Sequence, residues 1–159
     1  METAPLKTAV DSPLGPVIAL DLGAKRIGVA VSDALSISIS RLDALPRTNW
    51  KRMLRSVVDL VRRFDAQTVV IGLPLQLNGG AGDAALEVHA IARKFALSLD
   101  VPVYLQDERL SSVQAEENLR AEGHDAVRVS ALVDSEAAAV ILRDFLVSSQ
   151  ERILVRSVE

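Results

Sequence analysis

Two apolar runs joined by a short polar turn constrain this chain more than any other feature. The first run, residues 17–20, is typical of a buried strand that ends at Asp21, and the second, residues 27–31, is typical of a strand returning beside it. A buried carboxylate without a partner costs several kcal/mol, so such a group usually has a counter-charge or a metal ion beside it. Asp21, placed where a strand ends and a glycine-containing turn begins, is therefore the first candidate site residue.

The composition indicates one domain of ordinary globular character. The 159 residues are enough to bury a core, and 49% of them are hydrophobic, which is too many for general disorder. The absence of cysteine excludes disulfides, thiol catalysis and thiolate metal sites. No apolar run approaches the ~18 residues that a membrane span needs, and the N-terminus has no signal-peptide core. We therefore expect a cytoplasmic protein without a membrane partner.

One basic segment contrasts with a net charge of −3. A protein that coats nucleic acid by overall charge would be basic throughout, so any such contact here must be local. The segment is either the solvated face of a helix or a patch that contacts phosphate, and the sequence does not choose between them. Between residues 41 and 63, two acidic residues accompany seven basic ones, namely Arg41, Arg47, Lys51, Arg52, Arg55, Arg62 and Arg63.

Hydrophobic periodicity predicts three consecutive strands followed by alternating helices and strands. A meander followed by helix–strand alternation gives an α/β fold whose mixed five-stranded sheet, the meander plus parallel strands, is flanked by helices. Residues 1–16 and 149–159 are predicted to be terminal tails, which leaves one domain over residues 17–148. The meander is expected within 17–42 with its third strand at 36–40, later strands at 68–72 and 101–105, and helices at about 49–64, 88–99, 111–120 and 130–148.

Further acidic residues are placed where they could meet Asp21. Asp107 and Glu108 follow the 101–105 strand; if that strand lies parallel and adjacent to the first, their carboxylates open at the edge where α/β sheets place their sites. On the last helix, Asp134 shares a stripe that is otherwise apolar, which turns it toward the sheet. A first-turn acid can equally cap a helix or offset its dipole, and spacing alone does not separate these roles for Asp134.

Three carboxylates gathered together repel one another unless a cation lies among them. With no cysteine and two histidines, the ligands would be oxygens, which favours Mg²⁺ or Mn²⁺ over Zn²⁺. Two such ions ~3.5–4 Å apart would activate a water and stabilise the leaving oxygen of a phosphodiester. Lys25, Arg26 and Arg109 are either phosphate contacts or ordinary surface charges. His89 and His124 lack ligand spacing, and we expect neither to be catalytic.

Four motifs in order resemble the YqgF/RuvX family over roughly residues 17–148. The resemblance implies a ribonuclease H-like fold and a metal-dependent nuclease in which Asp21, Glu108 and Asp134 are the catalytic, metal-binding acids. It implies a nucleic-acid substrate, either the 5′ end of precursor 16S rRNA in ribosome biogenesis or a Holliday junction in recombination. The motifs are 21–33, 70–75 with Asn78 and Gly79, 107–112, and 133–138 with Ile141 and Leu142.

One departure from the family pattern concerns substrate contacts. The family commonly has lysine shortly before the last aspartate, whereas this chain has Ser130 and Leu132 there. Arg128 is the nearest base and joins Lys25, Arg26 and Arg109 as an expected nucleic-acid contact. A Holliday junction is two-fold symmetric, so its resolution would require a homodimer, whereas a monomer could trim RNA.

Two other functions agree with the same residues. The first is a non-catalytic adaptor that binds RNA or protein through the same fold. The second is an ATP-binding module, because the run that starts at Asp21 also resembles the phosphate loop of actin-like kinases. Those kinases close two such domains over the nucleotide, and this chain has room for one.

Overall fold

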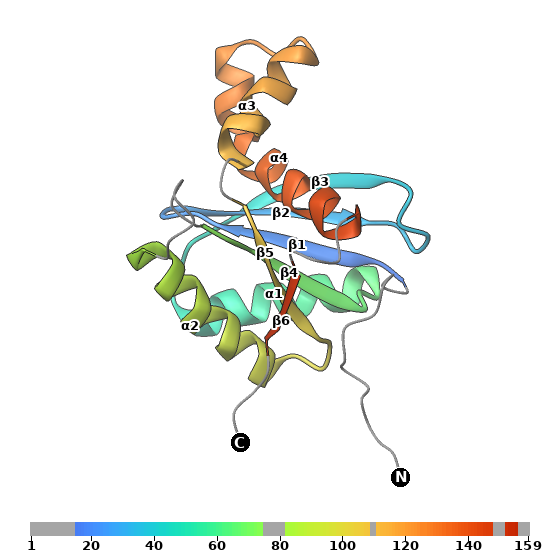
Figure 1. The fold of residues 1–159 in the computed structure, drawn as a ribbon, viewed down its shortest axis with the longest axis vertical. Helices are drawn as coiled ribbons and strands as arrows, with labels where there is room; N and C mark the ends of the chain where they lie inside the picture. The colour runs from blue at the N-terminus through green and yellow to red at the C-terminus, as the bar shows by residue number, and fades with distance from the viewer. Residues whose placement is uncertain (1–14, 75–81, 109–110, 148–151, 156–159) are drawn as a thin grey trace.

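The structure, a computed structural model, describes residues 15–74, 82–108, 111–147 and 152–155. Its centre is a mixed sheet of six strands in the order β3-β2-β1-β4-β5-β6, which confirms the predicted α/β class (Figure 1). β1, β4 and β5 are parallel neighbours, whereas β2, β3 and β6 pair antiparallel. The strands are β1 Val17–Leu22, β2 Arg26–Ser32, β3 Ile39–Pro46, β4 Thr68–Leu73, β5 Val103–Asp107 and β6 Arg152–Val155.

Two strands differ from the prediction. The alternating run at 36–40 is mostly turn, because Asp33 accepts a hydrogen bond from the Ile37 backbone at 2.7 Å and Ser36 has a left-handed φ of 58°. β3 therefore starts at Ile39. Residues 152–155, predicted to be tail, form β6 along the outer edge of β5 and raise the strand count from five to six. Pairing with β5 satisfies backbone groups that an open sheet edge would expose.

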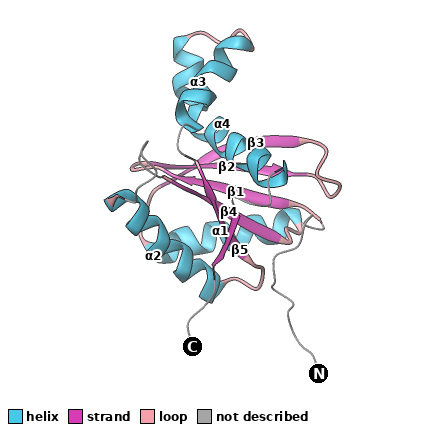
Figure 2. Ribbon diagram, in the orientation of Figure 1, coloured by secondary structure: helices cyan, strands magenta, loops and turns pink. Residues whose placement is uncertain are grey.

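Helices cover both faces of the sheet (Figures 1 and 2). α1 (Trp50–Phe64) and α2 (Asp83–Ser98) lie side by side on one face, where the Trp50 and Phe95 rings meet at 4.8 Å. α4 (Ala126–Val147) crosses the other face, and α3 (Ser111–Ala121) packs on α4 beyond the sheet. None of the described helices is long and apolar enough to cross a membrane.

Alternation along the strands sorts their side chains between two cores. In β1, Ile18 and Leu20 pack under α1 and α2, whereas Val17 and Ala19 pack with α4. Asp21, two residues after Ala19, therefore lies on the α4 face as well. The end of β1 therefore presents its carboxylate toward α4, as the sequence stripe on that helix requires.

The last helix begins at Ala126, four residues before its predicted start at 130. Asp125 provides the reason, because its side chain accepts a hydrogen bond from the Arg128 backbone at 2.9 Å and so caps the helix. Asp134 consequently lies in the third turn. The alternative role for Asp134, a first-turn acid that caps the helix or offsets its dipole, is wrong.

Candidate active site

Asp21 lies near the end of β1, directly opposite Gly28 in β2. Its side chain is half-buried, and its pKa is raised to about 7. Burial is the largest cause, followed by the negative charges of Glu108 and Asp134. The three predicted acids therefore lie close enough for two of them to act electrostatically on the third, although they are up to 113 positions apart in the sequence.

Glu108 reaches this region from the end of β5. Its backbone N–H donates to the Leu73 carbonyl at 3.1 Å, which extends the pairing of β4 with β5 by one step. Strand alternation places Leu105 under α1 and α2, so Asp107 belongs to that face and Glu108 to the α4 face. The structure thus places Asp107 and Glu108, which the sequence analysis did not distinguish, on opposite faces of the sheet.

Of the two conditions set for the strands of Asp21 and Glu108, one is met: β1 and β5 run parallel, but they are not adjacent, because β4 lies between them. Two strand spacings separate them by about 10 Å. Gly72 in β4 makes the approach feasible. A Cβ on Gly72 would lie 2.8 Å from Cγ of Glu108 and would overlap Cδ1 of Ile141, so Glu108 lies over the glycine. The absence of a side chain at Gly72 leaves room for Glu108. The sequence analysis assigned Gly72 no such role.

We expect Gly72→Ala to lower the nuclease activity that the motif resemblance implies by roughly tenfold or more, because displacement of a reacting group by about 1 Å is costly. The new methyl group pushes Glu108 away from Asp21 and crowds Ile141. Cleavage rate and urea unfolding measure the two effects separately. In the background of Ile141→Val, which lacks Cδ1, Gly72→Ala should be less destabilising but equally poor in activity. Recovery of activity in that background would contradict the role given to Glu108.

Asp134 is brought to the sheet by close contact between α4 and β2. A Cβ on Gly28 would overlap the backbone of Asp134 and Ser135, so the helix sits directly on this glycine. Ser135 fixes the contact, since its hydroxyl donates to the Leu42 carbonyl at 2.5 Å and lies 3.4 Å from the Val29 backbone nitrogen, which donates to it. Asp134 is thereby positioned over the end of β1.

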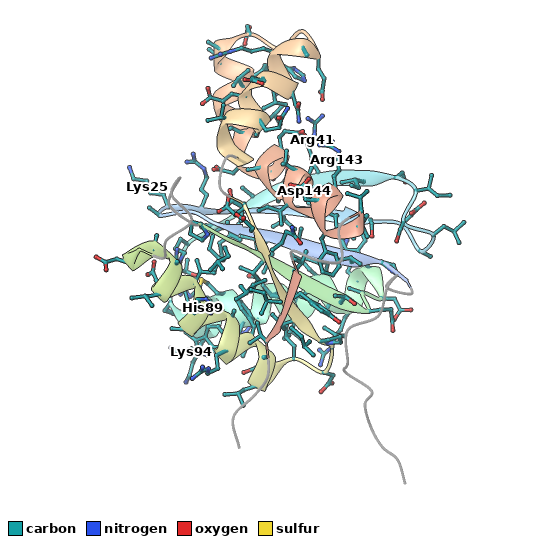
Figure 3. The ribbon with its side chains drawn as sticks, viewed as in Figure 1. Lys25, Arg41, His89, Lys94, Arg143 and Asp144 are labelled. Carbon is teal, nitrogen blue, oxygen red and sulfur yellow. The ribbon has the colours of Figure 1, made fainter. Side chains whose placement is uncertain are left out.

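The predicted basic residues have different environments. Arg26 Nε lies 2.7 Å from Oδ2 of Asp134, and Lys25 is exposed at the same edge of the sheet (Figure 3). Arg128 is exposed on the first turn of α4, about 9 Å along the helix from Asp134. Arg109 lies outside the described residues, as do Asn78 and Gly79 of the second motif.

One buried acid beside the candidate site was missed by the sequence analysis. Glu136 is 1% exposed and accepts hydrogen bonds from Arg41 and Arg143, each at 3.1 Å, and from Asn118 at 2.8 Å. These contacts tie α4 to β3 and α3 two residues after Asp134. On a helical projection Glu136 lies opposite the apolar stripe, where a solvated acid is expected, so its sequence signal was misleading.

The histidines lie apart from the three acids. His89 is exposed on α2, on the opposite face of the sheet from α4 (Figure 3). His124 follows α3, and its Nε2 lies 3.3 Å from a carboxylate oxygen of Glu122. His89 is thus separated from Asp21 by the sheet.

The three acids offer the oxygen ligands that a divalent cation prefers, but their side chains are not placed to hold one. Asp21 near two other carboxylates is an oxygen-donor set that a cation would relieve. Within the described ranges, however, no three acidic or histidine side chains are placed closely enough to form a ready metal site. The Arg26 contact accounts for part of this, because it holds the Asp134 carboxylate in an ion pair.

This sheet and helix arrangement is that of the RuvC-like nucleases with a ribonuclease H fold. The *Thermus thermophilus* RuvC structure matches with a TM-score of 0.50 and 17% identity over 87% of this chain and 99% of that one. The fowlpox virus Holliday junction resolvase matches with a TM-score of 0.51 and 14% identity, over 82% and 97%. At such identities the likeness establishes the fold.

The chain belongs to the RuvX family, described as Holliday junction resolvase, whose family model matches residues 15–148. A *Gloeobacter violaceus* protein described as a "putative pre-16S rRNA nuclease" is 41% identical over 130 residues, which is 82% of each chain. The resemblance drawn from the four sequence motifs is confirmed, and the chain is a member of a nuclease family.

Proposed function

We propose that this protein is a divalent-metal-dependent nuclease in which Asp21, Glu108 and Asp134 bind the metal, as two Mg²⁺ or Mn²⁺ ions. The observation that carries the proposal is the raised pKa of Asp21 beside two further acids. A purely structural carboxylate would be paired with a base, whereas Asp21 lies among like charges at the edge of the sheet. Perturbed groups of this kind are concentrated at functional sites.

Each acid has a distinct place in the proposed reaction. Asp21, in β1, and Glu108, directly after β5, define where the scissile phosphate lies, while Asp134 closes the site from α4. Bound metal would supply Lewis acidity and lower the pKa of an attacking water. Above pH 7, the Asp21 side chain is mostly ionised and able to bind a cation. The pKa of Asp21 therefore predicts that metal binding weakens as the pH falls below about 7.

Arg26 and Lys25 are placed to hold phosphates flanking the cut. Arg26 is half-exposed and needs little movement to exchange the Asp134 carboxylate for a phosphate oxygen. This exchange would free Asp134 to act with Asp21. We extend the phosphate-binding role to Arg128, which is exposed on α4, and to Arg109 on the basis of its position directly after Glu108.

Precursor 16S rRNA is the substrate that we propose first, because the curated relatives named for that activity share up to 41% of their residues with this chain. Holliday junction DNA is the second candidate and is favoured by the description of the matched family. Junction resolution would require a homodimer that presents two sites. Either substrate is consistent with the cytoplasmic location that we propose.

Cleavage of end-labelled precursor rRNA and of a four-way DNA junction, each with Mg²⁺, Mn²⁺ or EDTA, tests this function. We expect metal-dependent cleavage that Glu108→Gln abolishes. Asp107→Asn is the matched control, because it removes the neighbouring carboxylate on the opposite face and should retain most activity. Binding without cleavage would instead support the adaptor. Thermal stabilisation by ATP, with no cleavage, would support the nucleotide-binding module.

A further inference from the structure

The exposed face of α1 is mainly basic. Helical spacing places the apolar residues of α1 toward the sheet, with Met53 and Val57 buried. The opposite side is solvent-exposed and includes one acid, Asp59. The five basic residues on this face, which we call the α1 basic face, are Lys51, Arg52, Arg55, Arg62 and Arg63.

The structure divides the basic segment of the sequence into two parts. Arg41 is engaged with Glu136 and Glu122, and Arg47 bonds the Gly23 carbonyl and Glu87, so these two residues hold the fold together. Among the described residues, by contrast, no carboxylate is paired with any member of the α1 basic face. The described carboxylates therefore leave the charge of these five side chains unneutralised.

The α1 basic face begins beside the candidate active site. The Arg47 backbone N–H donates to the Lys25 carbonyl at 2.9 Å, and Arg26 pairs with Pro46, so the turn that carries Lys25 is tied to the segment leading into α1. The helix then lies along the face of the sheet opposite α4 (Figure 1). Cations thus continue from the edge of the site onto the opposite face.

The charges at the start of α1 are placed against the helix dipole. Lys51 and Arg52 occupy the first turn, and that turn contains no acid. Cations near the positive end of a helix are unfavourable, whereas an anion bound there is stabilised. The spacing suits a charged chain, since Lys51, Arg55 and Arg62 lie along one side of the helix over about 16 Å.

We propose that the α1 basic face binds the phosphate backbone of a second segment of the nucleic acid that is cut at the Asp21 site. The inference rests on the proposed function, because it uses the same substrate. A strand or duplex arm leaving the site at Lys25 passes around the edge of the sheet and lies along α1. Phosphate contacts of this kind hold the substrate in register and add affinity without reading its sequence.

A binding assay in EDTA, where no metal is present for cleavage, tests this inference. The probe is a fluorescent precursor-rRNA hairpin titrated with protein in EDTA at several salt concentrations. For Arg55→Gln/Arg62→Gln we expect roughly tenfold weaker binding at low salt and a slope of log affinity against log salt that is smaller by about 2. Arg93→Gln/Arg120→Gln removes two exposed cations from other helices and should change affinity by less than about twofold.

A charge-preserving variant separates electrostatics from folding. Arg55→Lys/Arg62→Lys should bind nearly as well as the original protein, whereas loss of binding in that variant would overturn the inference. An unchanged salt slope in the glutamine variant, with normal binding by the original protein, would also overturn it while leaving the proposed nuclease function intact. If the original protein binds neither the hairpin nor a DNA junction, the proposed function itself fails.

Discussion

Replacement of Gly28 by alanine is expected to destabilise the protein by about 3 kcal/mol or more, because added volume in a packed interface must be accommodated by backbone movement. The new Cβ would overlap the backbone of Asp134 and Ser135, which cannot rotate away as a side chain can. Displacement of α4 also breaks the Ser135 contacts to β2 and β3. Urea unfolding would measure the loss, and any protein that still folds should lack nuclease activity.

Gly123→Ala is a useful control for this substitution. Gly123 has a left-handed φ of 93° and no atom within 4 Å of the place a Cβ would take, so alanine there costs backbone strain without overlap. Gly28 lies in β2, beside an irregularity in the pairing of β2 with β3, and does not have a positive φ, so the cost of alanine there is steric. A smaller loss of stability at Gly28 than at Gly123 would contradict the close approach of α4 to β2.

Replacement of Asp21 by asparagine should stabilise the metal-free protein above pH 7. The pKa of Asp21 is about 7 in the folded protein against 3.8 for a free side chain, so the folded state binds the proton more tightly. Ionisation therefore removes stability between about pH 4 and pH 7. Above pH 7 the difference between the two proteins should reach about 2–4 kcal/mol, and near pH 4 it should vanish.

Denaturant unfolding of both proteins over this pH range measures the difference directly. Asp59→Asn, at an exposed position on α1, should show no comparable divergence. Excess Mg²⁺ or Mn²⁺ should stabilise the original protein and have little effect on Asp21→Asn. A constant difference across the pH range would contradict the burial of Asp21 among like charges.

Much of the fold could be predicted because hydrophobic periodicity reports local structure directly. The first two strands, the strands around residues 70 and 104 and the first helix all follow from runs and stripes of apolar residues. Of the strand predicted at 36–40, residues 36–38 belong to a turn, and they were mistaken for strand because their alternating Ser and Ile residues copy a strand pattern. β6 was missed because a four-residue edge strand depends on pairing with β5, which no local pattern encodes.

The acids of the candidate site could be selected from their positions at strand ends and on a helix stripe. The distance between the strands that carry Asp21 and Glu108 could not be predicted. The sequence gives no strand order, so β4 between β1 and β5 was unforeseen. The importance of Gly28 and Gly72 was equally hidden, because each acts through the side chain it lacks. Such contacts are visible only when the elements are assembled in three dimensions.

The order in which the chain supplies its acids has a consequence during synthesis. β1 and β5 provide Asp21 and Glu108, but Asp134 enters only with α4, which ends at Val147. A nascent chain that has emerged as far as α3 therefore holds two acids of the set and lacks the helix that covers this face of the sheet. The site that we propose for cutting RNA is incomplete until most of the chain has left the ribosome. The order of synthesis alone thus means that α4 is the last element needed to complete the set of three acids.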